Sequence, residues 1–162
     1  MNAPEHISIS SLLNERAILL DLKEPHKNTL LHELCTKLAE VYHDIPADTF
    51  YEHILDREND LSTGIGNHIA IPHALMDNLQ EIHLLFATHV GLNYDALDNK
   101  TVKIIFLLAI PIDRKELYGK LLMQISTYLR QKEFRDSLLQ AKEPTAIIDI
   151  FTAIEQADRG VA

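Results

Sequence analysis

An arginine, two glycines and a histidine follow one another within residues 57–73. Arg57 supplies a permanent cation, and Ser62–Gly66 can form a tight turn with inward-facing amide N–H groups, because glycine tolerates unusual backbone angles. His73 follows Pro72, which restricts the approach of the chain. A neutral imidazole is a nucleophile toward phosphorus, and a guanidinium with oriented N–H groups stabilises a transferring phosphoryl group. These residues suit phosphoryl transfer through His73, with no metal and no cofactor.

Spacing alone leaves other interpretations open. Glycine pairs also occur in plain turns, and a histidine after proline also occurs as an ordinary polar residue at the end of a strand. The same anion pocket could instead bind a small phosphorylated molecule. A dinucleotide site is excluded, because Gly64-Ile65-Gly66 lacks the third glycine and its turn is expected to precede a strand.

A longer pattern decides between these interpretations. The sequence contains Arg57-Glu58, then Thr63-Gly64-Ile65-Gly66, then Ala70-Ile71-Pro72-His73. This order resembles the active-site signature of the fructose/mannitol/nitrogen-regulatory class of enzyme IIA of the bacterial phosphotransferase system. The similarity continues through residues 94–99 into 102–111, and the length of the chain is closer to the free-standing nitrogen-regulatory type than to a module of a large permease.

The resemblance implies that His73 accepts a phosphoryl group from a small HPr-like phosphocarrier, and that Arg57 and Thr63 line the site beside the turn with Gly64 and Gly66. Sugar-transporting relatives pass the phosphate to a cysteine of an enzyme IIB, whereas regulatory relatives use their phosphorylation state to bind or release target proteins. We favour a nitrogen-regulatory phosphocarrier. A sugar relay to an enzyme IIB, or an interaction module with weak or no phosphotransfer, remains the alternative.

Two positions depart from the family pattern. His68 stands where the family commonly has glycine, and Tyr118 stands where many relatives carry a second histidine. A tyrosine hydroxyl can bond a phosphate oxygen but cannot become cationic at neutral pH. We therefore treat both as possible modulators of His73 and expect weaker stabilisation of the phosphorylated state. His68 and His73 are five apart in an extended segment, so they face opposite sides and a joint metal site is not expected.

The elements around this motif alternate between strands and helices. Apolar residues at three-and-four spacing predict amphipathic helices, and short runs rich in Ile, Leu, Phe and Val predict strands. The expected strands are 17–22, 68–71, 82–90 and 102–110, and the expected helices are 29–42, 48–57 (capped by Asp48), 115–131, 134–139 and 146–154. The stretch 58–67 is expected to be a loop. This order predicts an α/β protein of α+β type, with a mixed sheet flanked by helices.

Composition limits the remaining possibilities. The 162 residues suit a single domain over 1–162, with residues 1–6 and 157–162 frayed or disordered. The net charge of −9, without a segment that clusters Lys and Arg, argues against nucleic-acid binding and suits a basic protein partner. No apolar run reaches about 18 residues, so membrane insertion is not expected. The single Cys35 is expected to be buried, and the absence of a secretory pattern favours a cytoplasmic location.

Overall fold

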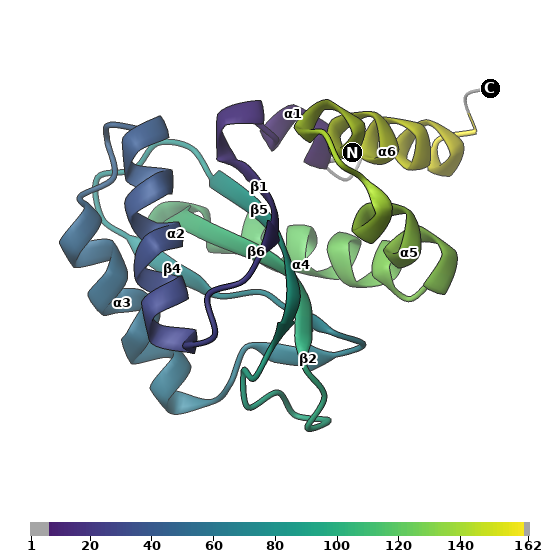
Figure 1. The fold of residues 1–162 in the computed structure, drawn as a ribbon. Coiled ribbons are helices and arrows are strands. Elements are labelled where there is room, and N and C mark those ends of the chain that lie inside the picture. The colour runs from purple at the N-terminus through teal and green to yellow at the C-terminus, as the bar shows by residue number, and fades with distance from the viewer. Residues whose placement is uncertain (1–6, 161–162) are drawn as a thin grey trace.

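A computed structural model describes residues 7–160 of the chain, and its elements alternate largely as the sequence predicts (Figure 1). The strands are β1 (Ile18–Leu22), β2 (Gly64–Gly66), β3 (Ile69–Ala70), β4 (His73–Met76), β5 (His83–Leu92) and β6 (Val102–Pro111). The helices are α1 (Ile9–Leu12), α2 (Lys27–Val41), α3 (Ala47–Asp60), α4 (Lys115–Leu129), α5 (Lys132–Gln140) and α6 (Pro144–Asp158), with short 3-10 turns at Glu15–Ala17 and Ile112–Arg114.

The strands form one mixed sheet in the order β1-β5-β6-β3-β2, with β4 also paired to β6. The two long strands β5 and β6 are antiparallel, β1 runs parallel to β5, and β3 and β4 both run parallel to β6. β3 and β4 therefore follow one edge of β6 in succession, separated by Ile71 and Pro72. Because proline has no N–H to donate to a ladder, the break falls where the sequence cannot continue the pairing.

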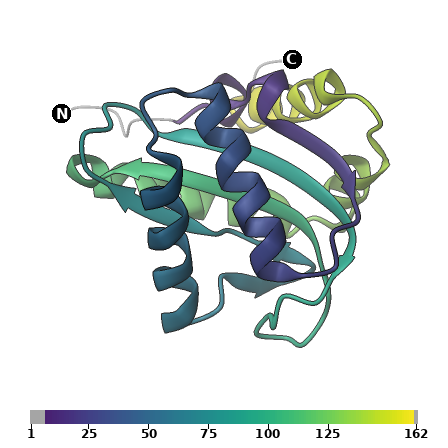
Figure 2. The same cartoon turned by 60° about the vertical axis from the view of Figure 1, so that its left-hand side comes forward.

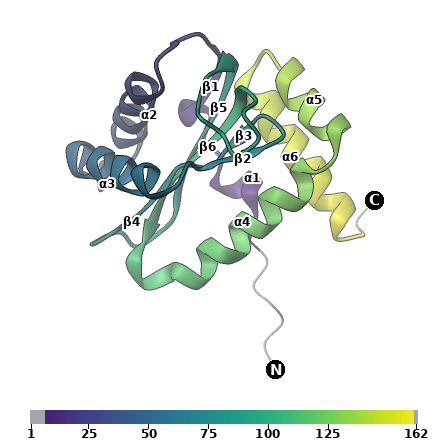
Figure 3. The ribbon, with the colours of Figure 1, turned by 90° about the horizontal axis from the view of Figure 1, so that it is seen from below.

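Helices cover both faces of the sheet. Figure 3 shows α2 and α3 on one side and α1, α4, α5 and α6 on the other. The side chains of β5 and β6 alternate between two apolar clusters, Leu85 and Leu107 packing under α2 and α3, and Phe86 and Phe106 packing under α4 and α6. The view in Figure 2 shows α2 and α3 lying across the strands on their face of the sheet. The predicted α/β fold, a mixed sheet flanked by helices, is confirmed.

Three local predictions are wrong. α3 is preceded by Pro46 and not capped by Asp48, which lies in its first turn, and it continues to Asp60 instead of ending at Arg57. The expected single strand 68–71 is only β3, and a further strand begins at His73 itself. The tight turn expected at Ser62–Gly66 is also wrong, because Gly64–Gly66 form strand β2.

The turn lies one step further along the chain. Asn67 and His68 have φ angles of 54° and 66° and connect β2 to β3. Two successive residues with positive φ are the pattern of a type I′ hairpin turn, which twists in the sense that the flanking strands require. His68 thus occupies a left-handed position where glycine is favoured, which gives a physical reason for the glycine expected there from the resemblance.

The C-terminal end of the chain and Cys35 can also be compared with the predictions. Residues 157 and 158 are helical, and the amides of Arg159 and Gly160 bond back to α6, so this part of the C-terminus is not frayed in the structure. Residues 1–6 and 161–162 lie outside the described residues. Cys35 is 1% exposed, as predicted, and burial raises the pKa of its thiol to about 12. No helix within residues 7–160 has both the length and the apolar character to cross a membrane.

Candidate phosphoryl-transfer site

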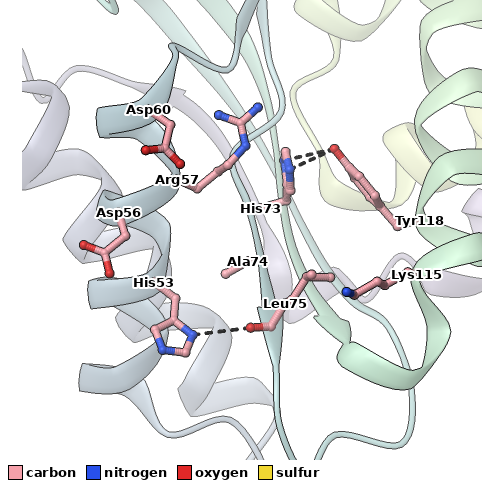
Figure 4. Close-up of a pocket in the computed structure, with 9 residues that line it drawn as sticks. All are labelled: His53, Asp56, Arg57, Asp60, His73, Ala74, Leu75, Lys115 and Tyr118. Carbon is pink, nitrogen blue, oxygen red and sulfur yellow. Dashed lines mark hydrogen bonds between the residues drawn. The ribbon is translucent and has the colours of Figure 1, made fainter.

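A pocket of about 540 Å³ lies between α3, β4 and the start of α4, and His73 is in its wall. Figure 4 shows α3 on one side of this pocket, α4 on the other, and β4 between them. Its lining side chains are His53, Asp56, Arg57 and Asp60 from α3, His73, Ala74 and Leu75 from β4, and Lys115 and Tyr118 from α4. The break at Pro72 places His73 as the first residue of β4, paired with Leu108 of β6.

The ring of His73 is oriented by a hydrogen bond to the backbone two residues before it. Its Nδ1 lies 2.9 Å from the carbonyl oxygen of Ile71. A carbonyl oxygen only accepts, so Nδ1 carries the proton and, in the neutral ring, Nε2 carries the lone pair. Burial lowers the pKa of His73 below 6.5, the Ile71 hydrogen bond opposes this shift, and the charge of Arg57 adds to it. His73 is therefore neutral, with its nucleophilic nitrogen defined, near neutral pH.

Tyr118 contacts this nucleophilic nitrogen. Its hydroxyl lies 2.9 Å from Nε2 of His73 and 3.3 Å from Nδ1, and the two rings are tilted with centroids 4.5 Å apart (Figure 4). Burial raises the pKa of the Tyr118 hydroxyl, so it stays protonated and can donate to Nε2. Tyr118, expected to replace a second histidine, therefore places a hydrogen-bond donor beside His73.

Two cations, Arg57 and Lys115, line the pocket that contains His73. Arg57, in the last turn of α3, extends toward His73, and one of its terminal nitrogens donates to the carbonyl oxygen of Leu61 at 2.8 Å (Figure 4). The guanidinium has further N–H groups for another acceptor. Lys115 lies three residues before Tyr118 on α4, so the two share one face of that helix. The pocket thus combines a neutral imidazole with two positive charges that an incoming phosphoryl group can meet.

Buried polar contacts behind Arg57 hold the end of α3. Glu58 points away from the pocket, and its carboxylate lies 3.0 Å from Nζ of Lys27 and accepts from the hydroxyl of Tyr94 at 2.7 Å. Thr63 donates its amide to the same carboxylate at 3.2 Å and hydrogen-bonds it through its hydroxyl as well. Since Glu58 is 8% exposed, this network fixes the helix end that presents Arg57.

Thr63 is consequently placed differently from the prediction that it lines the phosphate site. It is 3% exposed, and its hydroxyl also lies 2.9 Å from that of Tyr94. Gly64 and Gly66 are also outside the pocket lining, because they belong to β2. A Cβ on Gly64 would meet Cβ of Ala96 at 2.7 Å, so this glycine allows a close approach of the chain. The signature glycines here shape the hairpin rather than an amide cradle.

His68 is separated from His73. Its Nδ1 lies 2.7 Å from the carbonyl oxygen of Thr101, and its ring lines a different cleft, with residues of α5. The prediction placed both histidines in one extended segment, whereas His68 lies in the β2–β3 turn, so the turn and not the alternation of a strand separates them. Within residues 7–160, no group of three or more His, Cys, Asp or Glu side chains is arranged to hold a metal ion.

Sequence reasoning missed Lys115 and His53 as pocket residues. The spacing of Lys115 to Tyr118 is the signal that could have found the first, because residues three apart share a helix face. The spacing of His53, Arg57 and Asp60 on α3 carries the same signal. Asp56 and Asp60, both exposed, also line the pocket from α3 (Figure 4).

Comparison with known families identifies this arrangement. Residues 11–154 match the family model described as "Phosphoenolpyruvate-dependent sugar phosphotransferase system, EIIA 2". The chain belongs to this family. As an enzyme IIA domain it is 32% identical to the fructose-specific EIIABC component of Bacillus subtilis over 154 residues, which is 94% of this chain but 24% of that protein. The chain thus spans about a quarter of the length of that relative.

Several relatives of similar length are named nitrogen regulatory proteins. The one from Pseudomonas aeruginosa is 29% identical over 92% of this chain and 97% of its own, and the one from Bradyrhizobium diazoefficiens is 31% identical over 88% and 93%. The crystal structure of the nitrogen regulatory protein IIA-Ntr from Neisseria meningitidis matches with a TM-score of 0.82 and 26% identity, over 88% of this chain and 98% of that one. This enzyme IIA domain is therefore close to the nitrogen-regulatory type.

Proposed function

We propose that this enzyme IIA domain is a phosphohistidine carrier that accepts a phosphoryl group on Nε2 of His73 from an HPr-like protein. The observation that carries the proposal is the hydrogen bond from Nδ1 of His73 to the Ile71 carbonyl, which leaves the lone pair on the nitrogen that faces Tyr118 and the pocket. The lowered pKa of His73 keeps that lone pair available at neutral pH.

The transfer is an in-line exchange between two imidazoles. The bond between phosphorus and the donor's imidazole nitrogen breaks as a bond to Nε2 of His73 forms, and the donor ring leaves with its electron pair. Nδ1 keeps its proton and its hydrogen bond to the Ile71 carbonyl. This hydrogen bond stabilises the positive charge on the ring of the phosphorylated product. Arg57 and Lys115 stabilise the charge on the equatorial oxygens, and no metal is required by this step. Thr63, Gly64 and Gly66 act indirectly in this step, by fixing the conformation of the backbone.

Phosphorylation by the complete relay tests the proposal. Incubation with phosphoenolpyruvate, enzyme I and an HPr-type carrier should add one phosphoryl group to the chain, measured by intact mass spectrometry. His73→Ala should abolish the gain, and His53→Ala, a second histidine of the same pocket wall, should not. Labelling of His73→Ala at the wild-type level would refute the assignment. The same relay implies a cytoplasmic location, where phosphoenolpyruvate is present.

The destination of the phosphate distinguishes two versions of this function. We infer the nitrogen-regulatory version, supported by relatives of that name which align along more than nine-tenths of their length. The similarity to a fructose-specific EIIABC component supports a sugar relay to an enzyme IIB cysteine as the second candidate. Pull-downs with His73→Asp and His73→Ala baits separate them. A partner retained by one bait only favours regulation, and phosphate transfer to an enzyme IIB without such a partner favours the relay.

A further inference from the structure

The fold gathers basic residues that the sequence keeps apart. A cleft of about 270 Å³, distinct from the His73 pocket, is lined by Lys100 and Lys103 from the start of β6 and its preceding loop, and by Lys132 and Arg135 from α5. We call it the basic cleft. His68 completes its wall from the β2–β3 turn. β3 begins beside Ile104 and His73 pairs with Leu108, so the two sites are about 13 Å apart along β6.

The charge in the basic cleft opposes the charge of the whole chain, which is −9. The lining contains four permanent cations and one carboxylate, that of Asp136, which lies 2.8 Å from Nζ of Lys132. Lys100 and Lys103 form no salt bridge within the described part of the chain. Four positive charges against one negative leave an excess of three among the lining side chains, and Asp98, just outside the lining, offsets part of it at Lys100.

The walls of the basic cleft are fixed without a ligand. One terminal nitrogen of Arg135 donates to the carbonyl oxygens of Leu129 and Arg130 at the end of α4, at 2.6 Å and 3.1 Å. Its remaining N–H groups are available to another acceptor. On the opposite wall the His68 carbonyl accepts the amides of Lys103 and Ile104, at 2.8 Å and 3.0 Å. A site ordered before binding loses little entropy when an anion enters.

The side chains that line the basic cleft favour phosphate as the ligand. Arginine pairs with phosphate through a planar fork of donors, and lysine pairs with it as a compact charge. The basic cleft contains no Phe, Tyr or Trp to stack on a nucleobase and is too small for a large apolar ligand. A phosphate group carries about −1.5 to −2 charges at pH 7, so two such groups match the excess of three positive charges among the lining side chains. We propose that the basic cleft binds a small molecule that bears two phosphate groups. This inference does not depend on phosphorylation of His73.

Isothermal titration with inorganic pyrophosphate at constant ionic strength tests the proposal. The full chain should bind it at one saturable site, and Lys103→Gln should weaken that binding at least tenfold. Lys132→Gln, on a different element, should also weaken it, so the result does not depend on the folding of one variant. Lys120→Gln is the matched control, because it removes an exposed lysine of α4 outside the cleft. Citrate, a polyanion without phosphate, should bind at least tenfold more weakly.

Each other outcome would overturn the proposal. Loss of binding in Arg57→Gln with full binding in Lys103→Gln would place the anion in the His73 pocket. Equal weakening by Lys103→Gln and Lys120→Gln, or equal affinity for citrate, would reduce the effect to general charge attraction. Absence of saturable binding at millimolar pyrophosphate would leave the basic cleft without a small diphosphate ligand, and an acidic protein would then become the partner to test.

Discussion

The hydroxyl of Tyr118 lies 2.9 Å from Nε2 of His73, the nitrogen whose lone pair the Ile71 carbonyl leaves free. Both ring nitrogens of His73 are therefore hydrogen-bonded in this structure, one through its proton and the other through its lone pair. A phosphoryl group can reach Nε2 only after the Tyr118 hydroxyl has moved. After transfer, the same hydroxyl is close enough to donate to a phosphoryl oxygen. Tyr118 is thus expected to slow acceptance and to support the product.

Replacing Tyr118 by Phe should raise the initial rate of phosphorylation of His73. The substitution keeps the ring and removes the hydrogen bond that must break, which contributes about 0.5–1.5 kcal/mol, so an increase of about two- to tenfold is expected. Rapid-quench phosphorylation with a limiting HPr-type donor measures this rate. Tyr128→Phe makes the same chemical change elsewhere on α4, where the hydroxyl bonds Asp158, and should leave the rate unchanged. A slower Tyr118→Phe protein would mean that the hydroxyl mainly stabilises the transferring group.

Replacing Tyr118 by His should lengthen the lifetime of phosphorylated His73. A histidine can become cationic and donate a charge-assisted hydrogen bond to the phosphoryl group, which a tyrosine cannot do. A gain of about 0.5–1 kcal/mol corresponds to an increase of about two- to fivefold in half-life. The decay of the phosphorylated protein, followed by mass spectrometry after removal of the donor, gives this half-life. Identical half-lives in the two proteins would remove Tyr118 as a modulator.

Replacing Arg57 by Gln should lower the rate of phosphorylation by about 100-fold. Losing one preorganised donor to a developing negative charge costs about 10²–10³ in rate in other enzymes. Lys115→Gln should cost less than about tenfold, because a lysine at the pocket wall acts as a single flexible charge. Urea denaturation should show a stability change within about 0.5 kcal/mol for the exposed Lys115 and a loss of about 1 kcal/mol for Arg57, whose hydrogen bond to Leu61 is removed. An Arg57→Gln protein with the wild-type rate would exclude the guanidinium from the mechanism.

The sequence predicted the long elements well because their patterns are strong. The buried runs of β5 and β6 and the three-and-four spacing of α2 and α4 each bury a continuous apolar surface, so tertiary packing agrees with local preference. The short segments around His73 failed for the opposite reason. β2, β3 and β4 each have only two to four residues. β3 and β4 pair with β6, some thirty residues later, and β2 joins the sheet only through β3. A local periodicity contains no information about a partner strand so far along the chain.

The site was predicted in part for a related reason. The signature predicted that His73 and Arg57 act together, and the fold brings both to one pocket. Thr63 is turned inward by Glu58, five residues before it, and by Tyr94, whose hydroxyl bonds it directly from far along the chain, and a local pattern does not reveal either contact. The basic cleft could not be anticipated, since its lysines come from segments separated in sequence. Charge clustering of this kind arises only when the chain folds.

The buried network around Glu58 should make Lys27 important for stability. Lys27→Met removes the ammonium 3.0 Å from a carboxylate whose side chain is 4% exposed, and leaves that charge with only neutral donors. Breaking a buried pair on one side costs about 3–5 kcal/mol, and the remaining bonds from Tyr94 and Thr63 should reduce the loss to about 2–3 kcal/mol. Urea denaturation measures it. Lys37→Met, on the same helix but in an exposed pair at 3.9 Å, should cost less than about 1 kcal/mol. Equal losses in the two variants would mean that the network does not hold the end of α3.

The lowered pKa of His73 should appear both in its titration and in the stability of the fold. Burial is the main cause of the shift, so the folded state disfavours the charged ring. At a pH between the folded value and the unfolded value of 6.5, the unfolded chain binds more protons at this position. Stability from His73 is therefore fully present above pH 6.5 and is lost as the pH falls from there through the folded pKa.

Two measurements check this direction. NMR titration of the His73 ring should give a midpoint below 6.5, and phosphorylation should retain its rate to a correspondingly lower pH than free imidazole would. Urea denaturation across the same range should show a steeper loss of stability with acid for the wild type than for His73→Gln, which has no titrating ring. A midpoint above 6.5, or parallel stability profiles for the two proteins, would mean that the ring is more hydrated than its burial indicates, and that its neutral form is not secured by the fold.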